Sequence, residues 1–352
     1  MEEVYPGIYR LEAYPSEQHK SSGTQQVYFY LIPGDMDENG TRGRSLLIDT
    51  GYFTESGRTE VLEALWGLGI RVADLDVLIT HKHNDHCGQA HVLEEMGARI
   101  FMNPEEDAHA YDCISLSVTE RAMREQKDVL RRVGVTSARE PELYEDFRVL
   151  NEMLMGPDSE DIYLKVPNFG YEPVLPGQVL HYGDFHLTVL PLPGHTRGQV
   201  GLADEEKRLV FPADCLIRGV SPIVPTVETD EHLVRKLIAS LTLLKTNYSD
   251  CSMFQMHGPE IADVKGTADK IIASYQRKIL SIMRAVKTCY DPMTVKEIMV
   301  IGYGLQKEPD TVETFLTFKM MLTKTFSLVE YLFDEGYIER FEDDGMLFYA
   351  QK

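Results

Sequence analysis

Three imidazoles and one carboxylate fall within residues 81–86, as His81, His83, Asp85 and His86. They directly follow the short apolar run Leu75–Ile79, which is typical of a buried strand. They are therefore expected on the loop that leaves the carboxyl end of a strand, where open α/β sheets place their ligands. Neutral imidazole and carboxylate groups at this density favour zinc, iron or manganese. The alternative is a polar surface loop that is merely rich in histidine.

Further metal-binding side chains follow other predicted strands. Each stands just past a short apolar or alternating run and beside glycine or proline, as expected of ligands that a rigid sheet presents on loops. These residues are His195 in 193–196, Asp214 in 210–215 and His257 in 253–259. Cys87 and Cys215 adjoin two of the candidates, but enough nitrogen and oxygen donors are present without them. We therefore interpret both cysteines as buried structural thiols.

In this order, these stretches resemble the motifs of the metallo-β-lactamase superfamily of metal-dependent hydrolases, with a metal site like that of glyoxalase II. The matching segments cover roughly the first 265 residues and are 46–51, 80–86, 193–196, Asp214 and 257–259. The resemblance implies that His81, His83 and His195 hold one metal ion. It implies that Asp85, His86 and His257 hold a second ion, and that Asp214 bridges the two. It also implies that Asp49 orients a metal-binding histidine, since ligating imidazoles normally donate their other N–H to a carboxylate.

The same resemblance implies a hydrolase that uses a hydroxide held by two divalent ions. Zinc is favoured, with iron or manganese as alternatives. Asp85 is the candidate proton acceptor or donor for the leaving group. The expected substrate is a thioester, ester or lactone of a small molecule. Three alternatives stay open: a phosphodiesterase or ribonuclease of the same superfamily, an iron-dependent oxidoreductase similar to persulfide dioxygenases, and a non-catalytic regulator.

The composition and net charge indicate which binding partners and which compartment to expect. The net charge of −21 repels polyanions, so nucleic acid is not an expected partner. No apolar run reaches the length of a membrane span, and the first residues lack the basic and apolar regions of a signal peptide. Five cysteines without C-x-x-C spacing are typical of reduced thiols. We therefore expect a cytoplasmic enzyme that acts on a small molecule.

The pattern of predicted elements divides the chain. Short strands and helices alternate over residues 1–264, which indicates an α/β fold. By the resemblance, this part is expected to be a four-layer αββα sandwich. A helical insertion interrupts it at about 103–168, with helical patterns over 115–133 and 140–155. The charged, amphipathic spacing predicts helices laid on the surface, which either cover the pocket or pair two copies of the chain as a homodimer.

Residues 265–352 predict a separate small domain. The patterns indicate helices over 268–286, 294–299 and 312–333, followed by a hairpin over 337–349. This outline resembles a winged-helix module, which some metallo-β-lactamase relatives carry and which usually binds DNA. The hairpin tip carries Glu342, Asp343 and Asp344, whose charge has the wrong sign for binding phosphates. We therefore interpret the tail as a packing or dimerisation module.

Overall fold

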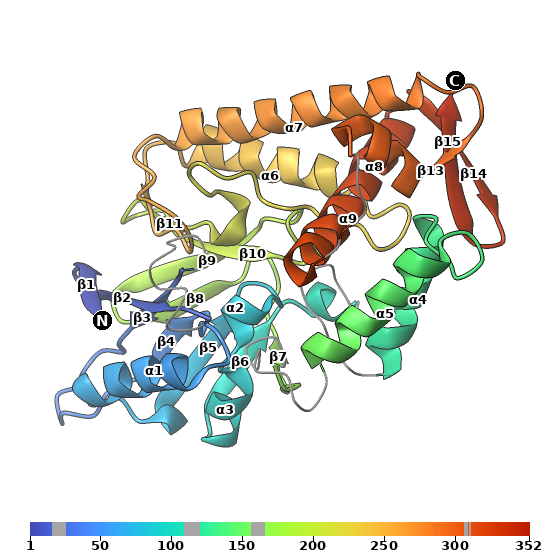
Figure 1. Ribbon diagram of the computed structural model, residues 1–352. Helices are drawn as coiled ribbons and strands as arrows, with labels where there is room; N and C mark the ends of the chain where they lie inside the picture. Colours follow the sequence, from blue (N-terminus) through green and yellow to red (C-terminus); the bar gives the residue numbers. More distant parts are fainter. Residues whose placement is uncertain (16–25, 109–119, 156–165, 306–308, 310) are drawn as a thin grey trace.

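The computed structural model describes residues 1–15, 26–108, 120–155, 166–305, 309 and 311–352. Two β-sheets lie face to face at its centre (Figure 1). Within these residues the larger sheet has seven strands that follow one another in chain order. They are β1 (Glu2–Tyr5), β2 (Ile8–Ala13), β3 (Val27–Ile32), β4 (Ser45–Ile48), β5 (Leu75–Ile79), β6 (Arg99–Met102) and β7 (Glu172–Pro173).

The second sheet, over the same described ranges, has five strands in the order β12-β11-β10-β9-β8. They are β8 (Val179–Tyr182), β9 (Phe185–Pro191), β10 (Val200–Asp204), β11 (Leu209–Phe211) and β12 (Ser252–Met253). Alternate side chains of each sheet are buried between the two, as the period of a strand requires. Tyr30 and Leu78 of the first sheet share this core with Leu187, Leu202 and Phe211 of the second.

Helices cover the outer face of each sheet. On the larger sheet, α1 (Glu55–Gly67) lies along β2 and α3 (Ala90–Glu95) along β6, and they bury Val61, Leu65 and Leu93 in the core of this sheet. On the smaller sheet, α6 (Leu233–Asn247) and α7 (Val264–Val286) share a core with Leu190 and Val210. The order helix, sheet, sheet, helix confirms the predicted α/β sandwich of four layers.

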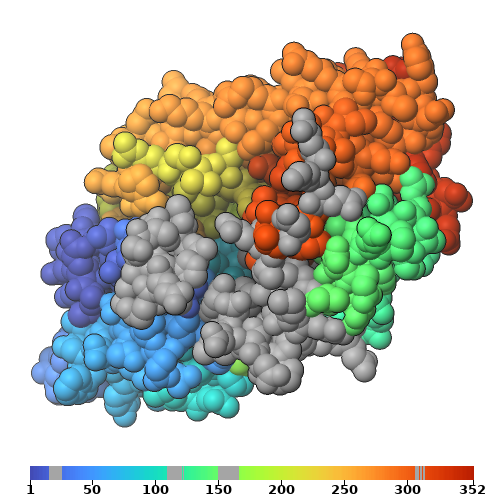
Figure 2. Space-filling model, in the orientation of Figure 1, coloured from blue at the N-terminus to red at the C-terminus, as the bar shows by residue number. Residues whose placement is uncertain are grey.

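The insertion lies on the surface, as predicted (Figure 2), with one buried face on each helix. It forms α4 (Glu120–Arg132) and α5 (Pro141–Met155), while 109–119 and 156–165 lie outside the described residues. Leu130 and Phe147 are buried in the core that includes α9 (Val312–Asp334), and the rings of Phe147 and Phe315 are 5.8 Å apart. Figure 2 shows the insertion in green against the C-terminal helices. The helices are therefore amphipathic elements of the surface, and their apolar stripe packs on a partner that is distant in sequence. The role of the insertion as a cover or as a subunit contact stays a prediction.

The C-terminal elements follow the predicted order. After α7 come β13 (Met293–Thr294), α8 (Val295–Tyr303), α9, β14 (Ile338–Asp343) and β15 (Met346–Gln351). Thr294 begins α8 with a capping box, in which its side chain and Glu297 satisfy each other's backbone N–H groups. In the described residues the last three strands form one sheet, β13-β15-β14. The assignment to the winged-helix class stays a prediction. We propose the boundary between 264 and 265 at the start of α7, whose core is nevertheless continuous with the sandwich.

Ion pairs also join the insertion to the tail. Arg139 lies 3.0 Å from Glu297, and Lys296 lies 2.9 Å from Glu140. Arg131 of α4 lies 3.4 Å from the carboxylate of Asp344, at the tip of the β14–β15 hairpin. The acidic tip therefore contacts this chain's own insertion, which agrees with the interpretation of the tail as a packing module.

Candidate metal centre

Four loops at one edge of the two sheets bring all seven predicted donors together. The loop after β5 continues into α2 (Asn84–Cys87), and the loop after β11 forms a short helical turn, Ala213–Cys215. The other two loops follow β9 and β12. Within each of three groups the candidate ligand atoms lie within 4.8 Å of one another, and the groups are His81 with His83 and His195, His81 with His86 and Asp214, and Asp85 with His86 and His257.

His83 stands at the centre of the first group. Its Nδ1 lies 3.0 Å from Nε2 of His81 and 2.9 Å from Nε2 of His195. All three imidazoles are buried. Burial and the neighbouring His83 lower the pKa of His195 to about 4, so this ring is neutral at physiological pH. Three ring nitrogens therefore point at one small, dry region.

The second group is slightly more open to solvent. Nε2 of His257 lies 3.2 Å from Nε2 of His86 and 3.3 Å from Oδ2 of Asp85. Asp214 stands between the two groups. Its Oδ1 lies 3.4 Å from Nε2 of His86, and its Oδ2 lies 3.5 Å from Nε2 of both His195 and His257. This is the position that the predicted bridging role requires.

Hydrogen bonds to the outer ring nitrogens fix the tautomers of these histidines. Nδ1 of His195 faces the carbonyl oxygen of Ile223 at 2.7 Å, and Nδ1 of His257 faces that of Gln26 at 2.8 Å. A carbonyl oxygen only accepts, so each Nδ1 carries the proton and each Nε2 presents a lone pair. His86 is held in the same way, since its Nδ1 lies 2.8 Å from Oδ2 of Asp49. The contact predicted for Asp49 is therefore made with His86.

Thr80 fixes the tautomer of His81 in a similar way. The backbone N–H and the hydroxyl of Thr80 both donate to Asp49, each at 2.8 Å. Because that hydroxyl hydrogen is used, Thr80 Oγ1 accepts from Nδ1 of His81 at 3.0 Å. Nε2 of His81 therefore also presents a lone pair. Asp49 has a φ of 61°, a strained conformation for a residue other than glycine, which is typical of residues held in place at functional sites.

This donor set fits a divalent metal. Four Nε2 atoms converge, and the buried Oδ1 of Asp214 accepts no hydrogen bond within the described residues. Ring nitrogens this close repel one another unless a proton or a metal ion lies among them. Burial disfavours a charge on His86, but the carboxylates of Asp85, Asp214 and Asp49 outweigh it and raise the pKa of His86 to about 10. The site therefore stabilises positive charge, which bound metal would supply through nitrogen and oxygen ligands.

Glycine allows two of the loops to pack closely. A Cβ at Gly88, which ends α2, would lie 2.2 Å from the backbone nitrogen of Phe53. Gly194, directly before His195, has a φ of 139°, and a Cβ there would lie 2.4 Å from Cα of Leu237 on α6. Any side chain at either position would push a candidate ligand out of place.

Glu106 is a functional candidate that the sequence analysis missed. It is buried in the short helical turn Pro104–Asp107, beyond β6. Its carboxylate accepts hydrogen bonds from the backbone of Lys82 at 2.9 Å and of Gly198 at 2.6 Å, and from the hydroxyl of Thr196 at 2.7 Å. It thereby joins the loop of His81 and His83 to the loop of His195. The sequence feature that could have identified it is an acidic residue just past a predicted strand, at the edge of the sheet where the candidate ligands lie.

The remaining side chains near the site have structural contacts. Cys215 is fully buried, and burial and Asp214 raise the pKa of its thiol well above the ordinary range, so it is not a thiolate. Cys87 is buried in the core under α3. Arg197 forms an ion pair with Glu105, with 3.2 Å between Nε and Oε2. These contacts agree with the interpretation of both cysteines as structural.

The chain belongs to the metallo-β-lactamase superfamily. The family model described as "Metallo-beta-lactamase superfamily" matches residues 26–247, more than half of the 352 residues. Two solved structures align with almost the whole chain. A beta-lactamase domain protein from Burkholderia ambifaria gives a TM-score of 0.74 at 22% identity, covering 99% of this chain and 94% of that one. A metallo-beta-lactamase family protein from Thermus thermophilus gives a TM-score of 0.68 at 23% identity, covering 99% and 100%. These likenesses support the fold alone.

Curated relatives match a shorter part of the chain. Hydroxyacylglutathione hydrolase GloC from Haemophilus influenzae is 27% identical over 155 residues, which cover 42% of this chain and 55% of the relative. Atrochrysone carboxyl ACP thioesterase from Claviceps purpurea is 24% identical over 161 residues, covering 45% and 49%. Human acyl-coenzyme A thioesterase MBLAC2 is 40% identical over 43 residues, covering 12% and 15%. The chain thus spans about half the length, or less, of the curated relatives it matches.

Proposed function

We propose that this protein is a binuclear metal-dependent hydrolase that cleaves thioesters of small molecules. The observation that supports the proposal is the convergence of imidazole nitrogens from three loops around the two carboxylate oxygens of Asp214. Thioesters are favoured over other esters and lactones because each of the three curated relatives is named for the hydrolysis of a thioester. The net charge of −21 also disfavours the polyanionic substrates of a nuclease.

We assign the ligands as the resemblance implies. His81, His83 and His195 would hold one ion, Asp85, His86 and His257 the other, and Asp214 would touch both. When bound, two such ions lower the pKa of water towards neutrality and polarise a carbonyl oxygen. Zinc is the proposed metal by the habit of the superfamily, and iron and manganese are the alternatives, since nitrogen and oxygen donors suit all three.

Asp85 is the proposed proton carrier. Its carboxylate is 18% exposed, against 9% for Asp214, so it lies nearer the opening of the site. Burial raises the pKa of Asp85, but His86 and the hydrogen bond from His257 outweigh it and hold the pKa well below the usual range. Asp85 is therefore ionised and able to accept a proton.

The reaction needs no oxidant and no covalent enzyme intermediate. The oxygen of water bonds to the acyl carbon, and the carbon–sulfur bond breaks. Asp85 takes one proton from the attacking water and delivers it to the departing sulfur, so that a thiol and a carboxylic acid form, and the acid then releases its proton to solvent as a carboxylate. A thiol has a pKa of about 8.5, so its sulfur departs with little assistance, and one carboxyl group is sufficient as proton carrier.

The test combines metal analysis with a substrate panel. Purified protein should contain about two metal ions per chain, and it should cleave a hydroxyacylglutathione or acyl-coenzyme A at least about ten times faster than a phosphodiester. His83→Ala should lower both metal content and hydrolysis. His181→Ala is the matched control, because His181 pairs with His186 in the β8–β9 hairpin, outside the candidate ligand set. Full activity without metal, or cleavage of phosphodiesters only, would overturn the proposal.

We also propose that the enzyme works in a reducing compartment such as the cytoplasm. Cys87, Cys215, Cys251 and Cys289, which are the described cysteines, are all free thiols. No helix in the described ranges is sufficiently long and apolar to cross a bilayer. Fractionation of cells that express the tagged chain would test the location, and recovery from an oxidising compartment would contradict it.

A further inference from the structure

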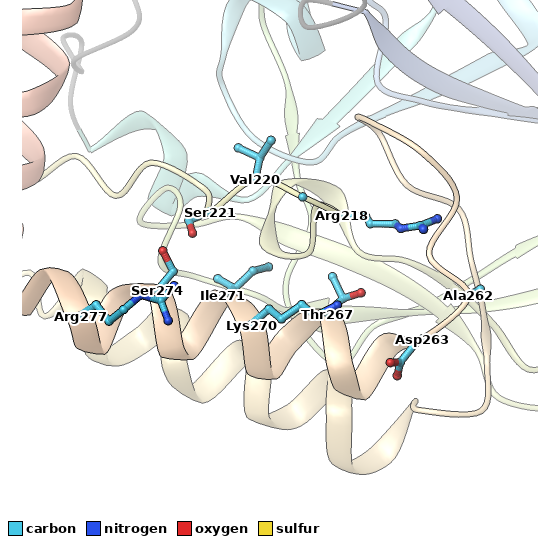
Figure 3. A pocket seen from close by; sticks show the side chains of 11 residues that line it. Arg218, Val220, Ser221, Ala262, Asp263, Thr267, Lys270, Ile271, Ser274 and Arg277 are labelled. Carbon is cyan, nitrogen blue, oxygen red and sulfur yellow. The ribbon is translucent and has the colours of Figure 1, made fainter.

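A pocket of about 450 Å³ opens between the loop after Asp214 and the first half of α7 (Figure 3). We name it the α7 pocket, and its polar and apolar lining includes Arg218, Ser221, Lys270, Ile271, Ser274 and Arg277. In Figure 3, Ser221 points from the loop towards α7, whereas Val220 points away from it. The volume lies within the usual range for ligand-binding sites, roughly 300–1,000 Å³.

The wall of the α7 pocket is continuous with the candidate metal centre. The loop that carries Arg218 and Ser221 begins at Asp214 and ends at Ile223, whose carbonyl oxygen holds His195. At Gly258, next to His257, an added Cβ would lie 3.4 Å from the carbonyl oxygen of Arg218. The loop that forms one wall of the pocket therefore also carries Asp214 and holds His195 in place.

The pocket is strongly basic in a chain of net charge −21. Among the described residues three cations and one carboxylate line it. Arg218 donates to the carbonyl oxygen of Glu260, and the carboxylate, Asp263, accepts from the backbone of Gly266 at the start of α7. Lys270 and Arg277 form no ion pair within the described residues and are exposed. Arginine and lysine with nearby serine hydroxyls are the donors that phosphate groups prefer in proteins.

The positive charge continues along the same face of α7. Lys278 lies four residues after Ser274, which is the spacing of neighbours on one helix face. It contacts Lys324 of α9, and burial together with the charge of Lys324 lowers the pKa of Lys278 to about 8. Two partly buried lysines in contact repel each other, and a bound anion would offset this cost. From Lys270 to Lys278 the helix rises by about 12 Å, so the basic face is longer than one phosphate needs.

We propose that the α7 pocket and this basic face bind the phosphate groups of a coenzyme A-type thiol carrier, whose thioester arm passes over Val220 to the metal centre. The inference rests on the proposed thioesterase function and specifies its substrate. Several phosphates suit a basic face of this length better than the compact carboxylates of a glutathione thioester. Val220 is 58% exposed and offers an apolar contact at the edge of the loop.

The experiment compares acetyl-coenzyme A, acetyl-phosphopantetheine and acetyl-pantetheine, which differ in their number of phosphates. The wild-type protein should show a KM for acetyl-coenzyme A about ten-fold or more below that for acetyl-pantetheine. In Lys270→Glu/Arg277→Glu this ratio should fall to about one. The matched control is Lys265→Glu/Lys287→Glu, which makes the same charge change at the two ends of α7, outside the pocket, and should keep the wild-type ratio. Lys270→Gln/Arg277→Gln serves if the charge-reversed protein does not fold.

The outcomes separate this inference from the proposed function. A ratio that is unchanged in the pocket variant overturns the inference, while cleavage of acetyl-pantetheine still supports the thioesterase. An equal preference for acetyl-phosphopantetheine and acetyl-coenzyme A overturns the multi-phosphate carrier in favour of a single phosphate, as on a carrier protein. If no thioester is cleaved, calorimetry with adenosine 3′,5′-bisphosphate still tests the pocket. Binding that the pocket variant loses supports the inference, and no binding overturns it.

Discussion

Strand β5 has a buried polar cluster at each end, and the two clusters balance their charges differently. Near the amino end, Asp76 accepts from Arg44 at 2.7 Å, from Arg99 at 2.6 and 2.7 Å, and from the hydroxyl of Tyr182 at 2.8 Å. Beyond the carboxyl end, His81 and its neighbours bring ring nitrogens and carboxylates together, and no lysine or arginine in the described part of the chain forms an ion pair with Asp85 or Asp214. Arginine side chains neutralise the cluster at one end of the strand, whereas at the other end positive charge would have to come from protons or from metal ions.

The difference separates a structural cluster from a functional one on the same element. Both clusters are buried beside the same strand, so burial alone does not distinguish them. Around Asp76 every strong acceptor has a donor, which is the usual condition of a polar group in a protein interior. At the metal centre the backbone and Asp49 instead hold imidazoles with their lone pairs facing one another. That arrangement costs free energy and is sustained only if a ligand offsets it.

Of the variants that test the difference between the two clusters, Asp214→Asn is expected to have the largest effect on metal content and activity. The amide keeps the shape of the side chain but removes the negative charge that lies near His86, His195 and His257. Metal content should fall from about two ions per chain to one or fewer, and kcat should fall at least about 100-fold. Elemental analysis and steady-state kinetics on one preparation measure both. Two retained ions with normal turnover would remove Asp214 from the metal centre.

A smaller effect, and of a different kind, is expected for Asp76→Asn. Loss of the carboxylate charge leaves Arg44 and Arg99 without their ion pair, but both side chains are partly exposed. The free energy of unfolding at pH 7 should therefore fall by about 2–3 kcal/mol, which is less than the roughly 3–5 kcal/mol expected for a fully buried pair. Metal content and kcat should not change. Asp74→Asn, which affects only a surface pair with Arg71, is the control and should unfold like the wild type. A loss of metal in Asp76→Asn would contradict the separation of the two clusters.

The pH dependence of the same variant gives an independent check. Burial opposes ionisation of Asp76, but hydrogen bonds from Arg99, Tyr182 and Arg44 outweigh it and hold the pKa of Asp76 below its ordinary value. A carboxylate with a lowered pKa contributes stability above its unfolded pKa of about 3.9, and this is lost as the pH falls through the folded value. The wild type should therefore lose more stability than the variant below about pH 4. Urea unfolding at pH 7 and pH 3 measures this difference.

The sequence predicted the donors of the metal centre because they are local. His81, His83, Asp85 and His86 lie in one loop, and each of the other three directly follows a strand, so their types and spacing carry the information. Local signals also predicted the helix that begins after Thr294, through its capping residue. The packing of α4 and α5 could not be predicted, because a helical period shows that Phe147 lies on an apolar face but not that Phe315 covers it. Arg218 and Lys270 likewise line one pocket only in the folded chain, so their separation in the sequence does not predict it.

The smallest expected effect concerns Glu106, which supports the metal centre without being one of its candidate ligands. Its two carboxylate oxygens accept from three donors on the two loops that carry His81, His83 and His195. Glu106→Gln replaces one oxygen with an amide group, which cannot accept from a facing N–H or hydroxyl, so at least one link between the loops is lost.

The metal affinity of Glu106→Gln should fall by about ten-fold. This is the lower end of the roughly 10- to 100-fold loss seen when residues that hold metal ligands are changed, because Glu106 holds the loops and not the imidazoles themselves. At saturating metal, kcat should return close to the wild-type value, which distinguishes a positioning residue from one that takes part in the reaction. Glu105→Gln is the matched control, since Glu105 forms a surface ion pair with Arg197. Metal titration of the two variants measures the difference. Equal metal affinities in Glu106→Gln and Glu105→Gln would show that Asp49 and the backbone alone hold the candidate metal ligands in place.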